Sequence, residues 1–236
     1  MCRRGGRVTR TCLPGSSWLG SADRVPADAS ATRDRIVAEA ERLFALDGVE
    51  GAQIRDIVRA AGQANDSAVH YHFGSRLGLL TAICERQIAR MEPARQQWLD
   101  ELRAQGRTGD LASLVAALIE PTSDLLHTQD GRYFLQIMVQ LAGRAGVREQ
   151  VQPTALTSTA LAEQLSLITS VVAERVPPAL ARERVALVIN LLTSALAERA
   201  VALDANASGL LKHDVAVANL EAMIVAALTA PSSPSV

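Results

Sequence analysis

The sequence has few of the residues that carry redox, metal or disulfide chemistry. Its three cysteines, Cys2, Cys12 and Cys84, are scattered, and no CxxC pair or cysteine–histidine cluster has the spacing of a zinc site. A disulfide framework is therefore not expected, which fits a reducing cytoplasm. Because Cys84 falls on a predicted helix among isoleucines, we interpret it as a buried structural thiol, with a redox sensor as the alternative.

The motifs of common enzyme classes are also missing. The sequence contains no GxGxxG, GxSxG, P-loop, HExxH or EF-hand pattern, and its carboxylates are spread along helix faces. His127 and His213 are isolated, and we expect each to be a surface residue. His70 and His72 are two residues apart on one short helix, so they point in different directions and make a poor metal pair. We therefore expect no catalysis, no cofactor and no metal. The alternative of an all-α enzyme is not supported by any recognisable set of catalytic residues.

Charge is balanced, and basic residues are almost all arginine. There are 24 basic and 25 acidic residues, and Lys212 is the only lysine. Any nucleic-acid surface must therefore be a local patch rather than a property of the whole chain. Genomic base composition explains the arginine preference better than phosphate binding does. No stretch approaches the run of about 20 apolar residues that crosses a bilayer, so no membrane partner is expected.

The two ends of the sequence differ in composition from the rest. Residues 1–31 place arginines among glycine, proline and serine, without the apolar run of a secretory signal. We expect a disordered arm there, or an extension created by a start codon placed too far upstream. If translated, its arginines would be available to phosphates or a minor groove. Residues 231–236 are expected to be a disordered tail.

Between these ends the pattern predicts an all-α protein. Apolar residues recur at helical spacing, and no useful segment alternates as a strand would. The first helix is expected from Thr32 or Arg33 to Leu46, with Ser30 or Thr32 as its cap. A later helix is expected from Arg76 to about Met91, and Pro93 should kink or end it. Further helices are expected through residues 98–102, 111–119 (interrupted by Pro121), 133–141, 153–175, 179–203 and 212–228.

Two short predicted helices flank a glycine turn. The first, about Gln53–Ala60, and the second, about Asn65–His72, are each apolar on one face, and Gly62 lies between them. A turn of this length between two short helices is the helix-turn-helix arrangement, in which the second helix lies in the DNA major groove.

Residues 32–82 resemble the N-terminal DNA-binding domain of the TetR/AcrR family of transcriptional regulators. The resemblance rests on apolar positions, glycines and a Tyr-His-Phe run at the family's spacing: Arg35-Ile36-Val37, Ala40, Leu43-Phe44-Ala45, Gly48, Ile54–Val58, Ala61-Gly62, Val69–Arg76 and Leu79-Leu80. It implies a helix-turn-helix domain over 32–75 and a larger helical regulatory and dimerisation domain over 76–230. It also implies a cytoplasmic homodimer on a pseudo-palindromic double-stranded operator, usually a repressor, released by a small, largely apolar effector.

The resemblance and the helix geometry together suggest a set of DNA-binding residues. Tyr71, His72 and Arg76 match positions that usually meet the phosphate backbone. The sequence departs from the family at Ala64, where a serine or threonine usually caps the recognition helix, and at Asp66, where glycine is common. The candidate DNA-binding residues are Gln53, Asn65, Asp66, Ser67, His70, Tyr71, His72 and Arg76.

The larger domain is expected to hold the effector among apolar side chains. Only 3% of residues are aromatic, which favours an aliphatic pocket. The candidate pocket residues are Trp98, Tyr133, Phe134, Met138, Leu141 and Asn190, with Gln140 and Arg144 as further polar groups. The last two helices are apolar on more than one face, which a second subunit would cover. The alternative is a helical dimeric binding or scaffold protein with a degenerate DNA-binding domain, supported by Ala64, Asp66 and the Ala52-Gln53 pair.

Overall fold

The computed structural model describes residues 27–63, 67–142 and 159–232, and these contain helices and no strand, as the sequence predicted. The elements are α1 (Ala27–Asp47), α2 (Ile54–Ala60), α3 (Ser67–Phe73), α4 (Arg76–Ala104), α5 (Leu111–Ser123), the 3₁₀ helix η1 (Asp124–His127), α6 (Gln129–Ala142), α8 (Ala160–Ala173), α9 (Pro178–Asp204) and α10 (His213–Thr229).

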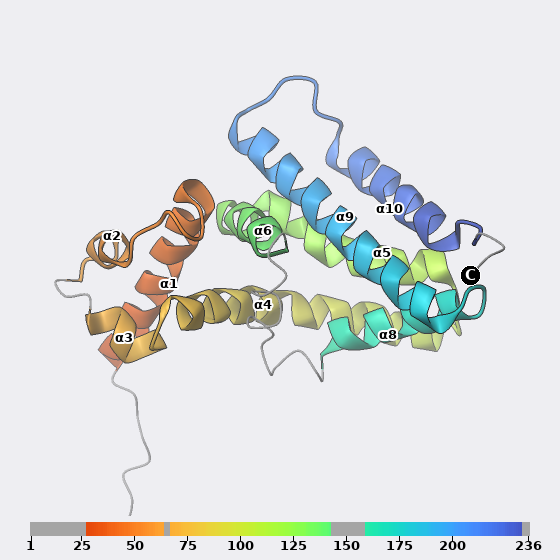
Figure 1. The fold of residues 1–236 in the computed structure, drawn as a ribbon, viewed down its shortest axis with the longest axis horizontal. Coiled ribbons are helices and arrows are strands. Elements are labelled where there is room, and N and C mark those ends of the chain that lie inside the picture. Colours follow the sequence, from red (N-terminus) through yellow and green to blue (C-terminus); the bar gives the residue numbers. More distant parts are fainter. Residues whose placement is uncertain (1–26, 64–66, 143–158, 233–236) are drawn as a thin grey trace, which may run out of the picture.

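The helices form a small unit and a larger bundle that share one long helix (Figure 1). The small unit contains α1, α2 and α3. From it α4 extends along the bundle made by α5, α6, α8, α9 and α10. Helix α6 packs against both α1 and α9, so it lies between the small unit and the rest of the bundle. Buried side chains form one apolar core through both parts.

Helix α1 begins at Ala27, earlier than the predicted start at Thr32. The sequence Ala27-Asp28-Ala29-Ser30-Ala31 contains no helix breaker, and alanine is the best helix former. The expectations that Ser30 or Thr32 caps the helix and that the disordered arm reaches residue 31 are therefore wrong. Residues 1–26 and 233–236, where the rest of the arm and most of the tail were predicted, lie outside the described residues.

Two prolines that were expected to break helices lie inside them. Pro93 lies within α4, which runs unbroken to Ala104. Pro93 has no N–H to donate to the carbonyl of Ala89, four residues earlier. Both residues are exposed, so water can donate to that carbonyl instead. Pro121 lies within α5, and the carbonyl of Ala117, which it deprives of a partner, accepts a hydrogen bond from Gln164 Nε2 at 3.2 Å. In both places the helix continues past the proline, because the carbonyl that lacks its helical partner can accept a hydrogen bond from another donor.

Helix α9 was not expected to resemble a membrane span, yet by length and composition it does. Among the described residues it is the one helix that is long and apolar enough to cross a bilayer. Of its most apolar stretch, 33% is buried inside the protein. Val188 and Leu192 belong to the core, whereas Leu187 and Val201 are exposed. Since α9 packs against α6, α8 and α10 in the bundle, its apolar residues serve the core on one side and remain uncovered on another.

A buried carboxylate joins α1 to α4. Glu41 is 1% exposed; it accepts hydrogen bonds from Gln87 Nε2 at 2.8 Å and from the guanidinium of Arg86, with which it forms an ion pair. Burial raises the pKa of the Glu41 carboxyl, and the opposing effects of Arg86 and Gln87 are smaller. The small unit is thus fixed to the long helix by a charge whose burial is only partly offset.

Replacing Glu41 with glutamine should change how stability depends on pH. A carboxyl whose pKa is raised by folding contributes stability at low pH, and this contribution is lost as the pH rises above its ordinary value of 4.5. Glutamine removes that contribution, so the melting temperature of the wild type minus that of Glu41→Gln should decrease as the pH is raised from about 4.5 toward neutrality. Glu39→Gln, which removes a surface partner of Arg42, is the matched control. A pH-independent difference for Glu41→Gln would contradict the assignment.

Candidate functional sites on the small unit and in the bundle

The α2–α3 segment has helix-turn-helix geometry. Gln53 precedes α2 in an extended conformation, and its carbonyl accepts from the amides of Asp56 and Ile57. After α2, Gly62 adopts φ of +71°, a left-handed conformation that favours glycine, and Gln63 N–H returns to the Val58 carbonyl at 2.9 Å. Gly62 therefore ends α2 in the left-handed conformation that the sequence predicted.

One face of α3 is buried and the other is open. Val69 is buried in the core of the small unit, and Phe73 packs partly against it. Tyr71 is 82% exposed, so its ring and its hydroxyl are both accessible to a partner. His72 is half-buried, and its ring meets that of Tyr71 edge-on at 4.9 Å. The exposed candidates are Gln53, Ser67, His70 and Tyr71.

Other candidates on this unit are constrained or lie outside the described residues. His70 Nδ1 lies 3.1 Å from the Gly74 carbonyl, which ties its ring to the turn after α3. Asn65 and Asp66 fall in the segment 64–66, outside the described residues, so their predicted contacts and capping stay predictions. The roles proposed for the exposed side chains also stay predictions, although their exposure makes them available to a partner.

Arg76 has a role that the sequence did not indicate. Its guanidinium donates to the carbonyls of Val49 and Ala52, at 2.5 and 2.7 Å, and lies 5.5 Å from the centre of the Phe44 ring. The side chain therefore holds the start of α4 against the loop between α1 and α2. Its predicted contact with a DNA phosphate stays a prediction. Arg76 would have to reach the phosphate while it keeps its hydrogen bonds to Val49 and Ala52.

The small unit also presents arginines that were not among the candidates. Arg55 and Arg59, one turn apart on α2, are 63% and 79% exposed, and both lie near Asp56. Arg33 of α1 lies 5.2 Å from the centre of the Phe73 ring. The i, i+4 spacing of Arg55 and Arg59 opposite the buried Ile57 and Val58 was the available signal. These cations give the nearly neutral chain a local positive surface.

A cavity of about 240 Å³ lies within the larger bundle, between α4, α5, α6, α8 and α9. Four of the six predicted pocket residues line it: Phe134, Met138, Leu141 and Asn190. Its other lining residues are mostly aliphatic, and they include Cys84, Ile88, Leu118, Leu135, Leu161, Leu165, Ile189 and Leu192.

Trp98 and Tyr133 do not line the cavity. On α6 the wall positions Phe134, Met138 and Leu141 follow the i, i+4, i+7 rule, and Tyr133 is rotated off that face. Trp98 lies nearly one turn beyond Arg95, the last α4 residue of the wall. Arg95 itself was not among the predicted pocket residues.

Cys84 is a buried residue of the cavity wall, 3% exposed. Burial raises the pKa of its thiol to about 12, with further effects from Glu41 and Glu85. This supports the structural interpretation over a redox sensor, because a thiol that stays protonated is a poor nucleophile.

Helix α6 connects the cavity wall to the small unit through Gln140. Gln140 Oε1 accepts from the Val49 amide at 2.8 Å, and its Nε2 donates to the Phe44 carbonyl at 3.3 Å. Gln140 was predicted as a polar group of the pocket, but it does not line the cavity. Instead it attaches α6 to the end of α1, directly beside the wall residue Leu141. Arg144, the other suggested group, lies outside the described residues.

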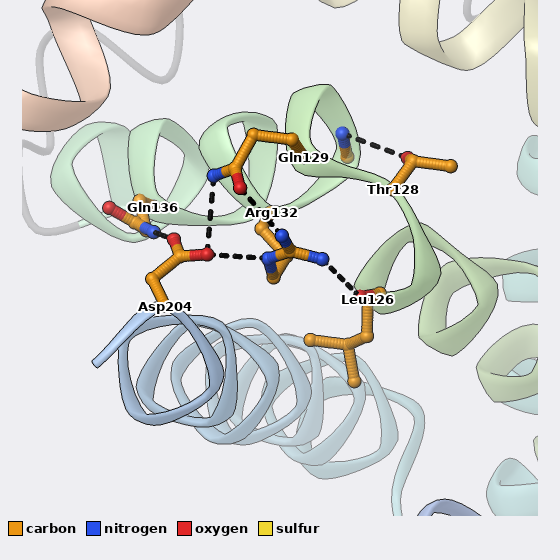
Figure 2. A network of polar contacts seen from close by, with 7 residues as sticks. Leu126, Thr128, Gln129, Arg132, Gln136 and Asp204 are labelled. Carbon is orange, nitrogen blue, oxygen red and sulfur yellow. Dashed lines mark hydrogen bonds and ion pairs between the residues drawn. The ribbon is translucent and has the colours of Figure 1, made fainter. Parts of the chain in front are cut away.

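The other end of α6 is fixed to α9. Figure 2 shows Asp204 directed from the end of α9 toward α6, where it accepts from Arg132 Nε at 2.6 Å and from Gln136 Nε2 at 2.9 Å. Arg132 also donates to the Leu126 carbonyl at 2.9 Å. Helix α6 is therefore held by polar contacts to the small unit and to α9, and it lines the cavity.

His127 and His213 are not isolated, contrary to the sequence prediction. Their ring centres lie 4.4 Å apart, and one ring nitrogen from each histidine and one carboxylate oxygen of Asp124 all lie within 4.8 Å of one another. Desolvation, followed by His127 and Arg199, lowers the pKa of His213. Asp124 and His127 are on η1 and His213 opens α10, so the cluster joins segments far apart in the sequence.

Comparisons with known proteins agree with the sequence resemblance. Residues 36–83 match the family described as bacterial regulatory proteins, tetR family. The chain is 28% identical over 118 residues to HTH-type transcriptional regulator SrpR of Pseudomonas putida, and the match spans half of this chain and half of SrpR. It is also 28% identical over 118 residues to the uncharacterized HTH-type transcriptional regulator TtgW of a Pseudomonas putida strain, covering 50% of this chain and 80% of TtgW.

The fold is shared with solved structures over most of the chain. Native NalD, described as the secondary repressor of the MexAB-OprM multidrug efflux pump in Pseudomonas aeruginosa, superimposes with a TM-score of 0.55 and 20% identity. The match covers 85% of this chain and 98% of NalD. The all-α architecture and the resemblance stated from the sequence are thereby confirmed.

Proposed function

We propose that this chain, which belongs to the TetR family of transcriptional regulators, is a homodimeric repressor that a small effector releases from DNA. The single observation that carries the DNA-binding part is the geometry of α3, which buries Val69 and leaves Tyr71 82% exposed. In this proposal residues 32–75 bind DNA, residues 76–230 bind the effector and the second subunit, and the protein acts in the cytoplasm.

The proposed DNA contact places α3 in a major groove. Its exposed side, with His70 and Tyr71, faces the bases and the phosphates, while Arg55 and Arg59 of α2 add positive charge nearby. Phosphate contacts fix the position of the helix, and base contacts supply the sequence preference. Two such heads related by two-fold symmetry would recognise a pseudo-palindromic operator.

The proposed subunit interface is the outer face of α9 and α10. Both helices carry large apolar side chains that the chain itself leaves exposed: Leu187 and Val201 on α9, and Val215 and Met223 on α10. Pairing these helices with those of a second copy would make a four-helix interface and remove this apolar surface from water. The packing of α9 against α6, α8 and α10 supports this assignment over a membrane span.

The proposed effector site is the cavity of the bundle. Because α6 supplies part of the cavity wall and also contacts α1 through Gln140, a ligand that shifts α6 would move the small unit. Release requires that the effector bind more tightly to the arrangement that does not fit the operator.

Tyr71→Ala should weaken operator binding by about tenfold, the effect of losing one contact of about 1.4 kcal/mol. Fluorescence anisotropy against the DNA upstream of the protein's own gene, at about 150 mM salt, measures this. Arg107→Ala removes an exposed arginine between α4 and α5 and should leave the affinity unchanged. A folded wild-type dimer that ignores this DNA and a wider genomic selection even at low salt would favour the scaffold alternative.

A further inference from the structure

Arg95 is a buried cation whose hydrogen-bond partners within the described part of the chain are all neutral. It lies on α4 in the cavity wall and is 3% exposed. Its guanidinium donates to Thr122 Oγ1 at 2.7 Å, Gln164 Oε1 at 3.1 Å, the Leu118 carbonyl at 3.3 Å and Met91 Sδ at 3.8 Å. Among the described residues no carboxylate forms an ion pair with it.

The charge of Arg95 persists at neutral pH despite its burial. Burial lowers the pKa of the guanidinium to about 10, and the carboxylate of Glu92 partly opposes this. Glu92 is itself engaged, since it accepts a hydrogen bond from the Ala160 amide at the start of α8. A buried charge without a close counter-ion is costly, so an anionic ligand in the cavity would stabilise it.

The rest of the wall favours a hydrocarbon. Leucine, isoleucine and methionine side chains from five helices make up most of the wall, and Phe134 is its aromatic residue. Besides Arg95, the polar residues of the wall are Thr122 on α5 and Asn190 and Thr193 on α9. The volume of about 240 Å³ is slightly below the usual range for ligand pockets, about 300–1,000 Å³, which limits the length of the occupant. Polar groups at one part of an otherwise apolar cavity fix the orientation of a ligand.

We propose that the cavity binds a short- or medium-chain aliphatic monocarboxylate, with its carboxylate on Arg95 and its chain among the aliphatic residues. This deepens the proposed function, because it names the chemical class of the effector and the residue that selects it. A guanidinium pairs with a carboxylate through two parallel hydrogen bonds, and in a desolvated site such a pair is strong. To form both bonds, the carboxylate would replace the weakest acceptor of the Arg95 guanidinium, Met91 Sδ at 3.8 Å. The bound anion would also link α4 to α5 and α8, through the groups that already hold Arg95.

Isothermal titration calorimetry of the full chain without DNA tests the proposal, using octanoate, 1-octanol and octylammonium at about pH 7.5, where the acid is ionised. Wild type should bind octanoate at least about tenfold more tightly than 1-octanol, because only the acid makes charge-assisted hydrogen bonds. Octylammonium should not bind. Met138→Trp, which fills the cavity, should abolish binding of both neutral and anionic ligands and so locate the site.

Arg95→Met should remove the preference for the acid while 1-octanol still binds. Arg90→Met is the matched control, because Arg90 lies on the same helix but is exposed and pairs with Asp130. Equal binding of octanoate and 1-octanol to wild type, no binding of octanoate, or an acid preference that survives in Arg95→Met would each overturn the proposal. If Arg95→Met does not fold, the wild-type comparison with Met138→Trp decides alone.

The calorimetry separates this inference from the proposed function. A protein that binds octanoate through Arg95 but ignores operator DNA would leave the carboxylate site standing and refute the regulator. A protein that binds operator DNA but does not prefer the acid would refute the carboxylate site and leave the proposed regulator standing.

Discussion

Replacing Phe44 with alanine should lower the free energy of unfolding by about 3–5 kcal/mol, the usual cost of removing a buried phenyl ring. Phe44 is fully buried on α1, the helix that packs against both α4 and α6. The Arg76 guanidinium lies over the Phe44 ring, and the Phe44 carbonyl accepts a hydrogen bond from Gln140 Nε2. The cavity left behind would weaken the attachment of the small unit to both α4 and α6. Urea denaturation followed by circular dichroism measures the loss.

Leu46→Ala is the matched control for Phe44→Ala. Leu46 lies two residues further along α1 and is 58% exposed, so its truncation should change the free energy of unfolding by no more than about 0.5 kcal/mol. The pair separates loss of packing from a change in helix propensity. A loss below about 1 kcal/mol in Phe44→Ala would mean that this junction does not hold the small unit in place.

The helix-turn-helix was predictable because its signals are local. The apolar spacing of Ile57 and Val58, the position of Val69 and the glycine at 62 all act within about twenty residues of chain. The structure buries the first three and gives Gly62 its left-handed conformation. Family resemblance then added the identity of the partner, which spacing alone does not contain.

The errors came from contacts between distant segments. Pro121 was expected to interrupt its helix, but Gln164 supplies a donor to the carbonyl that Pro121 leaves free. His127 and His213 are far apart in sequence and adjacent in space. Neither arrangement has a local signal, since each depends on how α8 and α10 dock on the helices before them. The early start of α1 is different, because its alanines are a local signal that favours a helix.

The cavity shows the same division. Phe134, Met138 and Leu141 share one face of α6, and the sequence predicted them together. Arg95 was missed because its burial depends on Thr122 and Gln164, which come from α5 and α8. The periodicity of α4 does place Arg95 on the same face as Met91, and that apolar stripe with one cation in it was the available clue.

Gln140→Leu should uncouple effector binding from DNA binding. Gln140 joins α6 to the Val49 amide and the Phe44 carbonyl, so its loss removes the polar contacts from the cavity helix to α1. Allosteric coupling of about 1–3 kcal/mol corresponds to a change in operator affinity of about 5- to 150-fold on binding effector. In Gln140→Leu this ratio should approach one. Fluorescence anisotropy with and without saturating octanoate measures it.

Gln136→Leu controls for the loss of any glutamine on α6. Gln136 lies one turn before Gln140, and its side chain donates to Asp204 of α9, away from the small unit. It should keep the wild-type ratio of operator affinities. Hydrogen exchange gives a second readout, because the Val49 amide should lose protection in Gln140→Leu and keep it in Gln136→Leu. If Gln140→Leu exposes that amide yet retains the full ratio, the signal reaches α1 through packing of α4 and α6 rather than through Gln140.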